Sequence, residues 1–310
     1  MLDHDTLGAR ARALGSALEP VIGQVYFSPE CHANYEALGF GPSPGNANGV
    51  ALPNGPAYFS SRGSVMGQVA PEVIAAAFAV FNPDAVVPAV QHGWSITDAR
   101  TICAARDAGA LAQLRRILGD APHGLGRAAE ILRRAVVPLR PEGRPLFAGV
   151  LSLGIPDDAL GAVWRCGDML REFRGDSHTA AWIAAGVDAT EIGLLTELFW
   201  GVPHRSYART RAWTDAQFDA AAARLEQRGW LSGAAFTEAG RAGREAIEVA
   251  TDVQMRPAIE AIGDDFDELI SILSPWGAEV RAQKGYLAAG PHDLAATTSA
   301  AAAAARRRTT

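Results

Sequence analysis

The chain has 310 residues, 48% of them hydrophobic and 20% charged, with a formal net charge of −6. This length predicts two folded parts and a tail, each folded part large enough to bury a core. The negative charge argues against a protein whose whole surface binds nucleic acid, because phosphate binding requires clustered cations, so any contact with DNA must be local.

The three cysteines, Cys31, Cys103 and Cys166, are far apart and form no CxxC pair. Their odd number and spacing argue against a disulfide framework or a thiolate metal site and favour a cytoplasmic location. Residues 1–20 contain no apolar block, so we do not expect a signal peptide. Polar residues and prolines interrupt the longest weakly polar stretch, residues 69–90, and we expect no membrane-spanning helix.

Apolar spacing, helix caps and Gly or Pro stops predict a helical N-terminal domain over residues 1–155. In this domain and just after it, helices are expected over residues 7–18, 29–38, 73–81, 97–108, 111–118, 125–136 and 159–173, with a further helix beginning at Asp84. Residues 39–55, rich in Gly, Pro and Asn, predict a long loop. Only residues 24–27 and 57–60 could pair as strands.

A candidate ligand site lies where Gly175 predicts a break between two helices. Arg174, Asp176 and His178 are neighbours there, and a carboxylate could orient the imidazole for acid–base chemistry or for binding a haem or a metal. The alternative, which we favour, is that Asp176 caps the helix entered near Ser177 and that a nearby carbonyl bonds His178. The candidate ligand or cofactor residues are Arg62, Arg174, Asp176 and His178. The other histidines share no metal-binding spacing, so the metal and cofactor are unknown.

The second predicted domain, residues 156–286, contains the elements of a winged helix. Residues 190–200 predict a helix that begins at Asp188 or Thr190 and ends at Gly201. A short second helix over residues 206–212 and a third over residues 216–228 give the helix-turn-helix order. Residues 230–236 then predict two strands joined by a turn, and Thr237 predicts the cap of a further helix.

Two stretches resemble MarR-type winged-helix regulators: residues 223–231, Ala-Arg-Leu-Glu-Gln-Arg-Gly-Trp-Leu, and residues 236–241, Phe-Thr-Glu-Ala-Gly-Arg. The whole chain also resembles a group of actinobacterial helix-turn-helix proteins, in residues 58–63, Tyr-Phe-Ser-Ser-Arg-Gly, and in residues 174–178, Arg-Gly-Asp-Ser-His. The first resemblance implies a mainly α fold with a MarR-like winged helix-turn-helix domain. The second implies no particular activity.

The charge of the winged-helix segment favours DNA binding. Residues 204–244 carry seven arginines and four acidic residues, a formal +3, which leaves about −9 for the rest of the chain. Arg205 and Arg209 are four residues apart, and a helix would place both on one face along a phosphate backbone. The residues expected to contact double-stranded DNA are Arg205, Ser206, Arg209, Arg211, Thr214, Gln217 and Arg241.

The start of the third helix argues against DNA binding. Asp215 and Asp219 would face phosphate and repel it, which leaves Thr214 and Gln217 as base readers. A winged helix that serves only as a protein–protein or structural module is therefore the alternative at this point.

Residues 255–273 predict a helix whose long apolar stripe suits either a homodimer contact or burial within one chain. Residues 287–310 predict a disordered tail rich in alanine and arginine. Our first hypothesis is a cytoplasmic, dimeric transcription regulator that responds to a small-molecule ligand. The second is an enzyme or a haem- or metal-binding protein that uses a degenerate winged helix as a scaffold or interaction module, although no catalytic motif supports an enzyme.

Overall fold

The computed structural model describes residues 2–288, and the fold is mainly α, as the sequence predicts. Two short antiparallel hairpins also occur in this part of the chain: β1 (Asn46–Ala47) pairs with β2 (Val50–Ala51), and β3 (Leu231–Ser232) pairs with β4 (Ala235–Phe236). No helix within residues 2–288 is long and apolar enough to cross a membrane. Of the predicted tail, residues 289–310 lie outside the described residues.

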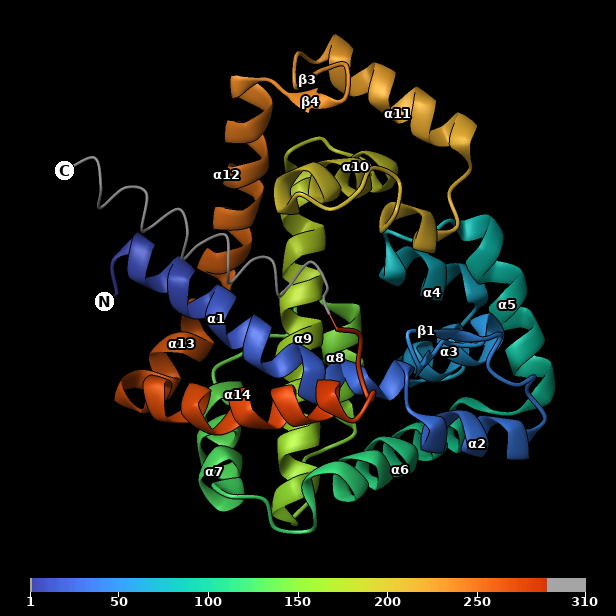
Figure 1. Cartoon of the computed structure of the whole chain (residues 1–310), viewed down its shortest axis with the longest axis vertical. Helices are drawn as coiled ribbons and strands as arrows, with labels where there is room; N and C mark the ends of the chain where they lie inside the picture. Colours follow the sequence, from blue (N-terminus) through green and yellow to red (C-terminus); the bar gives the residue numbers. More distant parts are fainter. Residues whose placement is uncertain (1, 289–310) are drawn as a thin grey trace.

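The first half of the chain forms helices that pack around one long helix, α9 (Ala159–Ala184), which runs through the middle of the molecule (Figure 1). These helices are α1 (His4–Ile22), α2 (Pro29–Leu38), α3 (Gly55–Gly63), α4 (Pro71–Phe78), α5 (Pro83–Ile96), α6 (Ala99–Leu118), α7 (Leu125–Val136) and α8 (Pro145–Ser152), with 3-10 turns η1 (Gly23–Tyr26) and η2 (Ser64–Met66).

The predicted helix caps explain several of these starts. The hydroxyl of Ser28 accepts a hydrogen bond from the backbone N of Cys31, and Gly39 ends α2 with φ +106°, as expected. The side chain of Asn82 caps α5 by accepting a bond from the backbone N of Asp84.

The predicted strands of this half were wrong. Residues 24–27 lie mostly in η1, and residues 57–60 belong to α3, which Asn54 caps with its side-chain oxygen. Each of these apolar runs is short, and the cap before residues 57–60 outweighs strand propensity. The hairpin of β1 and β2 lies instead within the predicted loop.

Two helix boundaries were also wrong. Pro20 lies inside α1, and Gly109 lies inside one continuous helix, α6, where the sequence predicted two helices. A Cβ atom on Gly109 would lie 2.6 Å from the Cα of Cys31 in α2. The glycine therefore allows two helices to approach each other closely and does not end one.

α9 is longer than its predicted end at residue 173, and the predicted break at Gly175 is absent. The helix continues to Ala184 because its second half is held on both sides: Phe173 packs in one apolar core, and Trp182 packs in another. A glycine inside a helix costs only about 1 kcal/mol, which such packing outweighs.

The winged-helix elements follow α9 in the predicted order and lie at one end of the molecule (Figure 1). They are α10 (Ala189–Trp200), η3 (Ala208–Arg211), α11 (Asp215–Gln227), the hairpin of β3 and β4, and α12 (Glu238–Gln254). Asp188, Thr214 and Thr237 cap the three α-helices, which confirms these starts. The second helix was only partly right, since a single 3-10 turn stands in its place.

After α12 the structure has α13 (Arg256–Ile262), η4 (Gly263–Asp265) and α14 (Phe266–Ala282), where the sequence predicted one helix over residues 255–273. Gly263, with φ +63°, breaks the helix. The apolar stripe on both sides of this break is buried in the larger core, so it serves the single chain.

The buried apolar residues form two clusters. The larger cluster, which we call the body core, draws on residues 7–173 and 255–286, and the smaller, the winged-helix core, on residues 181–247. Because the last helices return to the body core, we propose that residues 181–247 form the smaller unit. The predicted division at residue 155 stays a prediction.

We expect Gly109→Ala to lower the free energy of unfolding by ~1–3 kcal/mol, because the added methyl group forces α6 away from the backbone of α2. Gly126→Ala in α7 is the matched control, because a Cβ there meets no atom within 4 Å, and it should raise the free energy of unfolding by up to ~1 kcal/mol. Urea unfolding of both variants tests this. Equal effects of the two substitutions would contradict the close approach of α2 and α6.

Candidate functional site

A cavity of about 230 Å³ lies between the body and the winged-helix unit. Its wall combines side chains of α1, α3, α4 and α9 with side chains of α10, η3 and α12. All four residues predicted as a ligand site line it: Arg62, Arg174, Asp176 and His178. The structure thus brings together residues that are more than 100 positions apart in the sequence.

The charged side chains in the middle of α9 are paired with residues of surrounding helices. Glu172 receives two hydrogen bonds from Arg62 of α3, at 3.0 and 2.7 Å. Arg171 donates to Glu19 of α1 at 3.0 Å, and Arg174 pairs with Glu248 of α12. Although burial opposes ionisation, Arg62 and Arg171 hold the pKa of the Glu172 carboxyl below its usual range.

Asp176 caps a helix, but not the helix in which it lies. Its Oδ2 accepts a hydrogen bond of 2.9 Å from the backbone N of Phe147, in the first turn of α8. The residue before α8, Arg144, provides no side-chain cap, so Asp176 satisfies one of the free N–H groups of that turn. Burial raises the pKa of Asp176 to about 7.

His178 and Asp176 do not form the dyad that sequence spacing suggested. The Nδ1 of His178 lies 3.0 Å from the hydroxyl oxygen of Thr251, whereas Asp176 bonds to Phe147. Since the Thr251 hydroxyl donates to the carbonyl of Ile247, Nδ1 of His178 is the donor in the first contact. The partner of Nδ1 is thus a hydroxyl and not the predicted carbonyl. Within residues 2–288 no group of three or more His, Cys, Asp or Glu side chains could hold a metal ion.

Arg211, predicted to contact DNA, lies in the wall of this cavity. Its guanidinium carbon lies 4.6 Å from the ring centre of Phe81 and 4.4 Å from that of Tyr207. Among the described residues it has no carboxylate partner, and its buried Nε has no hydrogen-bond partner. Cation–π contacts hold the side chain in place, together with hydrogen bonds that its terminal nitrogens donate to the hydroxyls of Thr210 and Tyr207.

The segment Val80–Asn82, which we call the latch, joins the body to the turn before α11. The backbone N of Asn82 donates to the carbonyl of Arg211 at 2.9 Å, and its side-chain amide donates to the carbonyl of Ala212 at 3.0 Å. Trp213 donates through Nε1 to the carbonyl of Val80 at 2.9 Å. The latch thus connects the cavity wall, which includes Phe81, to the start of α11.

A strained turn shapes the latch. Ala79 has φ +50° and ψ −63°, and the backbone N of Val80 bonds to the carbonyl of Phe78. This is a γ-turn of the kind that is rare and strained for a residue with a side chain. Ala79 and Val80 also pack against the winged-helix core.

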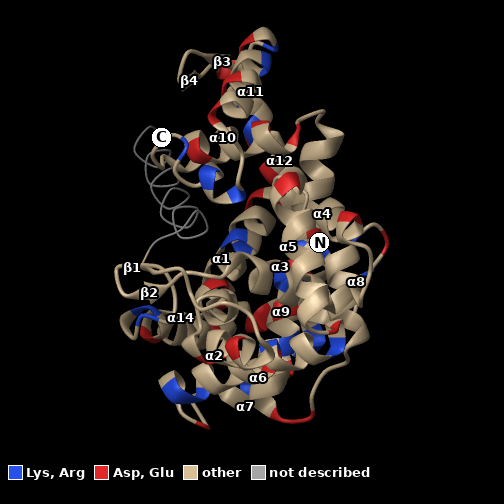
Figure 2. Ribbon diagram, turned by 90° about the vertical axis from the view of Figure 1, so that its right-hand side faces the viewer, with Lys and Arg blue, Asp and Glu red and all other residues tan. Residues whose placement is uncertain are grey.

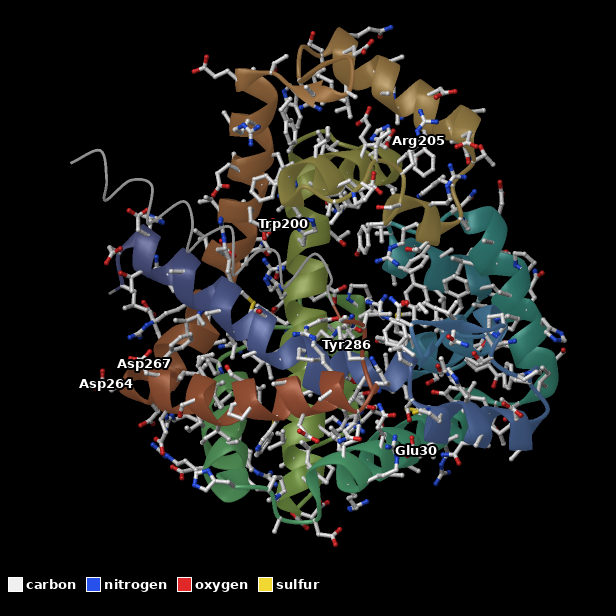
Figure 3. The ribbon with its side chains drawn as sticks, in the orientation of Figure 1. Glu30, Trp200, Arg205, Asp264, Asp267 and Tyr286 are labelled. Carbon is white, nitrogen blue, oxygen red and sulfur yellow. The ribbon has the colours of Figure 1, made fainter. Side chains whose placement is uncertain are left out.

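The arginines expected to contact DNA are paired with the acids of α11. Arg209 binds Asp215 at 2.6 Å, and Arg205, which Figure 3 labels, binds Asp219. Arg205 precedes η3 and has φ +57°, so the prediction that one helix face carries both arginines was wrong. The Arg209–Asp215 pair is largely exposed, at 54% and 62%, whereas Arg205 is only 24% exposed beside an Asp219 that is 69% exposed.

The other residues predicted to contact DNA have local roles. Thr214 and Gln217 form a capping box at the start of α11, and the hydroxyl of Ser206 donates to the carbonyl of Pro203. Arg241 is exposed beside the ring of Phe236.

The outward face of α11 carries little positive charge. Ala216, Ala220 and Ala223 are exposed there together with Asp219. Arg224, further along the helix, pairs with Asp188 and Glu191. Acidic and basic positions both occur along this part of the ribbon (Figure 2). The arginines on and beside α11 are therefore shared with carboxylates.

A family model described as a helix-turn-helix family matches residues 11–287, nearly the whole chain. The chain belongs to this helix-turn-helix family. No curated protein and no solved structure matches it.

In this helix-turn-helix protein, α10, η3 and α11 occupy the places of the three helical segments of the motif, and the hairpin of β3 and β4 follows as the wing. The match also covers the body helices, so the family is defined by the body and the winged helix together.

Sequence reasoning missed several cavity residues. Glu172 and Glu248, which neutralise Arg62 and Arg174, gave no signal, because an acidic residue in an expected helix is usually on its surface. The aromatic contacts of Arg211 depend on Phe81, from a distant part of the chain, and only the folded structure brings them together.

The raised pKa of Asp176 predicts how the stability of the folded protein depends on pH. In the unfolded chain this carboxyl ionises near pH 3.8, and in the folded protein near pH 7. Between these values the folded state binds the extra proton, so this carboxyl makes the protein less stable as pH rises from about 4 to about 7. Asp176→Asn keeps an oxygen that can cap α8 but removes the titration.

We therefore expect Asp176→Asn to change the free energy of unfolding only slightly at pH 4. As pH rises to 8, the variant should become more stable relative to the wild type by roughly 1–4 kcal/mol. Urea unfolding of both proteins across this pH range measures the difference. A difference that stays constant with pH would show that the carboxyl ionises normally in the folded state.

Proposed function

We propose that this helix-turn-helix protein is a DNA-binding transcription regulator with a MarR-like winged helix that responds to a small-molecule ligand. The order of α10, η3, α11 and the β-hairpin supports DNA binding. The cavity between the winged-helix unit and the body supports a ligand response, since pockets at such interfaces commonly bind ligands.

The main support for the proposal is that the cavity wall and the start of α11 are connected through shared residues and hydrogen bonds. Phe81 belongs to both the wall and the latch, and Asn82 holds the turn that leads into α11. A ligand that moves Phe81 or Arg211 changes the position of α11 relative to the body. Coupling between the cavity and the DNA-binding surface requires a ligand to favour one position of α11 over another, and the latch provides this connection.

The surface ion pairs of Arg205 and Arg209 are compatible with DNA binding. Exposed pairs of this kind contribute roughly 0–1 kcal/mol, so phosphate can replace Asp215 and Asp219 at little cost. Arg241 beside the wing provides a third cation in this region. We propose that these three arginines bind the phosphate backbone.

We further propose a cytoplasmic homodimer, which would place two winged helices on paired half-sites. Val249 and Val253, four residues apart on α12, are 42% and 37% exposed and form a candidate contact. The free, buried thiols of Cys31, Cys103 and Cys166 suit a reducing compartment.

A second candidate function is that of an enzyme or a haem- or metal-binding protein that uses the winged helix as a scaffold. The observation in its favour is Asp176, a cavity residue whose pKa of about 7 suits a general acid or base. An absorbance spectrum of the purified protein separates the two functions most simply. A coloured cofactor in stoichiometric amount would favour the second.

DNA binding is tested by selecting sites from a random duplex library at low salt with the purified chain. We expect an enriched site, and we expect Arg205→Ala and Arg209→Ala each to reduce the salt dependence of binding by roughly one unit. Affinity that does not change in either variant would remove these arginines from the interface. A library without any enriched site would contradict sequence-specific binding.

Substitution of the acidic partners should have the opposite effect on DNA affinity. Asp215→Asn and Asp219→Asn should each tighten DNA binding by roughly 2- to 5-fold, because each frees an arginine and removes a repulsive charge. Asp120→Asn is the control, since Asp120 is 92% exposed and belongs to the body. Fluorescence anisotropy with the selected duplex gives the three affinities. Weaker binding by either α11 variant would show that its carboxylate supports the interface.

A further inference from the structure

The turn between α10 and η3 carries Arg205, and Arg209 follows it in η3. We call residues 201–207 the basic turn. Two of them, Gly201 and Arg205, have positive φ angles, +67° and +57°. This conformation is unfavourable for a residue with a side chain, so contacts from outside the turn must hold Arg205 in it.

A single buried residue provides these contacts. Glu197 lies in the last turn of α10, and its side chain is fully buried. Its Oε2 accepts a hydrogen bond of 2.6 Å from the backbone N of Arg205, and its Oε1 accepts one of 2.7 Å from the backbone N of Ala208. The backbone carbonyl of Glu197 also accepts a bond of 3.0 Å from Val202. One residue thus holds the basic turn and the first residue of η3.

A carboxylate suits this position better than a neutral group. Both of its oxygens accept backbone N–H groups, and hydrogen bonds to an ionised acceptor are shorter and stronger than those between neutral groups. Apart from His204, whose Nδ1 lies 4.0 Å from Oε2, no basic side chain in the described part of the chain pairs with Glu197. Because a buried charge is costly without partners, the carboxylate favours the turn conformation that brings these N–H groups to it.

The conformation of the turn determines where both arginines lie. The guanidinium carbon of Arg205 is 5.6 Å from the ring centre of Phe218, in α11. Ala208 packs closely against α10, since a Cβ atom added to Gly193 would lie 3.1 Å from the Cβ of Ala208. Arg209 is the next residue, so its backbone position follows from that of Ala208.

We infer that Glu197 is a positioning residue for the phosphate-binding surface: it sets the positions of Arg205 and Arg209 without touching DNA itself. Its buried side chain offers no surface to a duplex. The inference rests on the proposed function, in which these two arginines bind the phosphate backbone. It adds a residue that lies beneath the interface and controls its geometry.

Glu197→Gln in the full chain tests this role, because glutamine has the shape of glutamate but only one acceptor oxygen. We expect the variant to bind the selected duplex roughly tenfold more weakly. We also expect the salt dependence of binding to fall by roughly one unit, because an arginine without a fixed position contributes less to phosphate binding.

Glu191→Gln is the matched control on the same helix. Glu191 is also a buried carboxylate that accepts a backbone N–H, from Asp188 at 3.0 Å, but it lies at the opposite end of α10. Glutamine can replace glutamate in a capping box of this kind. The control should therefore not lower the affinity for DNA.

A double-mutant cycle separates positioning from damage to the fold. In a chain that already carries Arg205→Ala and Arg209→Ala, Glu197→Gln should have no further effect on affinity, because neither arginine is left to position. A further loss of affinity in this background would show that the variant disturbs the winged helix as a whole, and would contradict the positioning role.

Hydrogen exchange measured by NMR gives a second reading without DNA. The backbone amides of Arg205 and Ala208 should exchange roughly tenfold or more faster in Glu197→Gln than in the wild type, because each loses a buried acceptor or shares one. The inference alone is overturned if these amides exchange at the wild-type rate, or if the wild type binds the duplex and Glu197→Gln binds it equally well. Failure of the wild type to bind any duplex would overturn the proposed function, and the role of Glu197 at DNA with it.

Discussion

The structure depends on the pairing of buried charges in the middle of α9. Arg171, Glu172 and Arg174 would each be costly to bury alone, and each finds a partner on a different helix: Glu19 on α1, Arg62 on α3 and Glu248 on α12. Asp176 adds a hydrogen bond to α8. Because these bonds converge on one segment, that segment fixes the relative positions of four surrounding helices. Loss of a single partner would leave a buried charge uncompensated, which is far more costly than loss of a surface pair.

The same charged segment explains why a cavity exists at this place. α9 contributes apolar residues to the body core and, through Trp182, to the winged-helix core. Besides the buried charges Arg165 and Asp168 within the body, it carries a second group of polar residues, from Arg171 to Thr179, that lies between the two cores and lines the cavity. Neither core closes over this segment, and the space between them becomes a cavity with a charged floor and an aromatic wall. The latch crosses beside it, so the position of α11 depends on residues that also line the cavity. Regulation by a ligand needs such an element, shared by two sites.

The winged helix could be predicted from the sequence because its signals are local. Asp188, Thr214 and Thr237 cap their helices through contacts two or three residues away, and the turn after Ser232 joins adjacent strands. The prediction at Gly109 was wrong because this glycine allows close approach to Cys31, which is distant in sequence. The predicted break at Gly175 is absent because the helix packs into a core on each side of it, and one sequence reveals neither contact. The four candidate ligand residues were named from composition and proximity, and the structure places them in one cavity. The role of Arg211 could not be foreseen, since its partners Phe81 and Asn82 lie about 130 positions earlier.

We propose that the cavity and the winged helix are coupled through the latch. The most direct test is the affinity of the full chain for its selected duplex, measured with and without a small molecule that saturates the cavity, together with the affinity for that molecule with and without the duplex. Thermodynamic linkage requires both affinities to change by the same factor, and we expect roughly 5-fold or more. Identical affinities in all four measurements, with both ligands bound, would contradict coupling between the cavity and the winged helix.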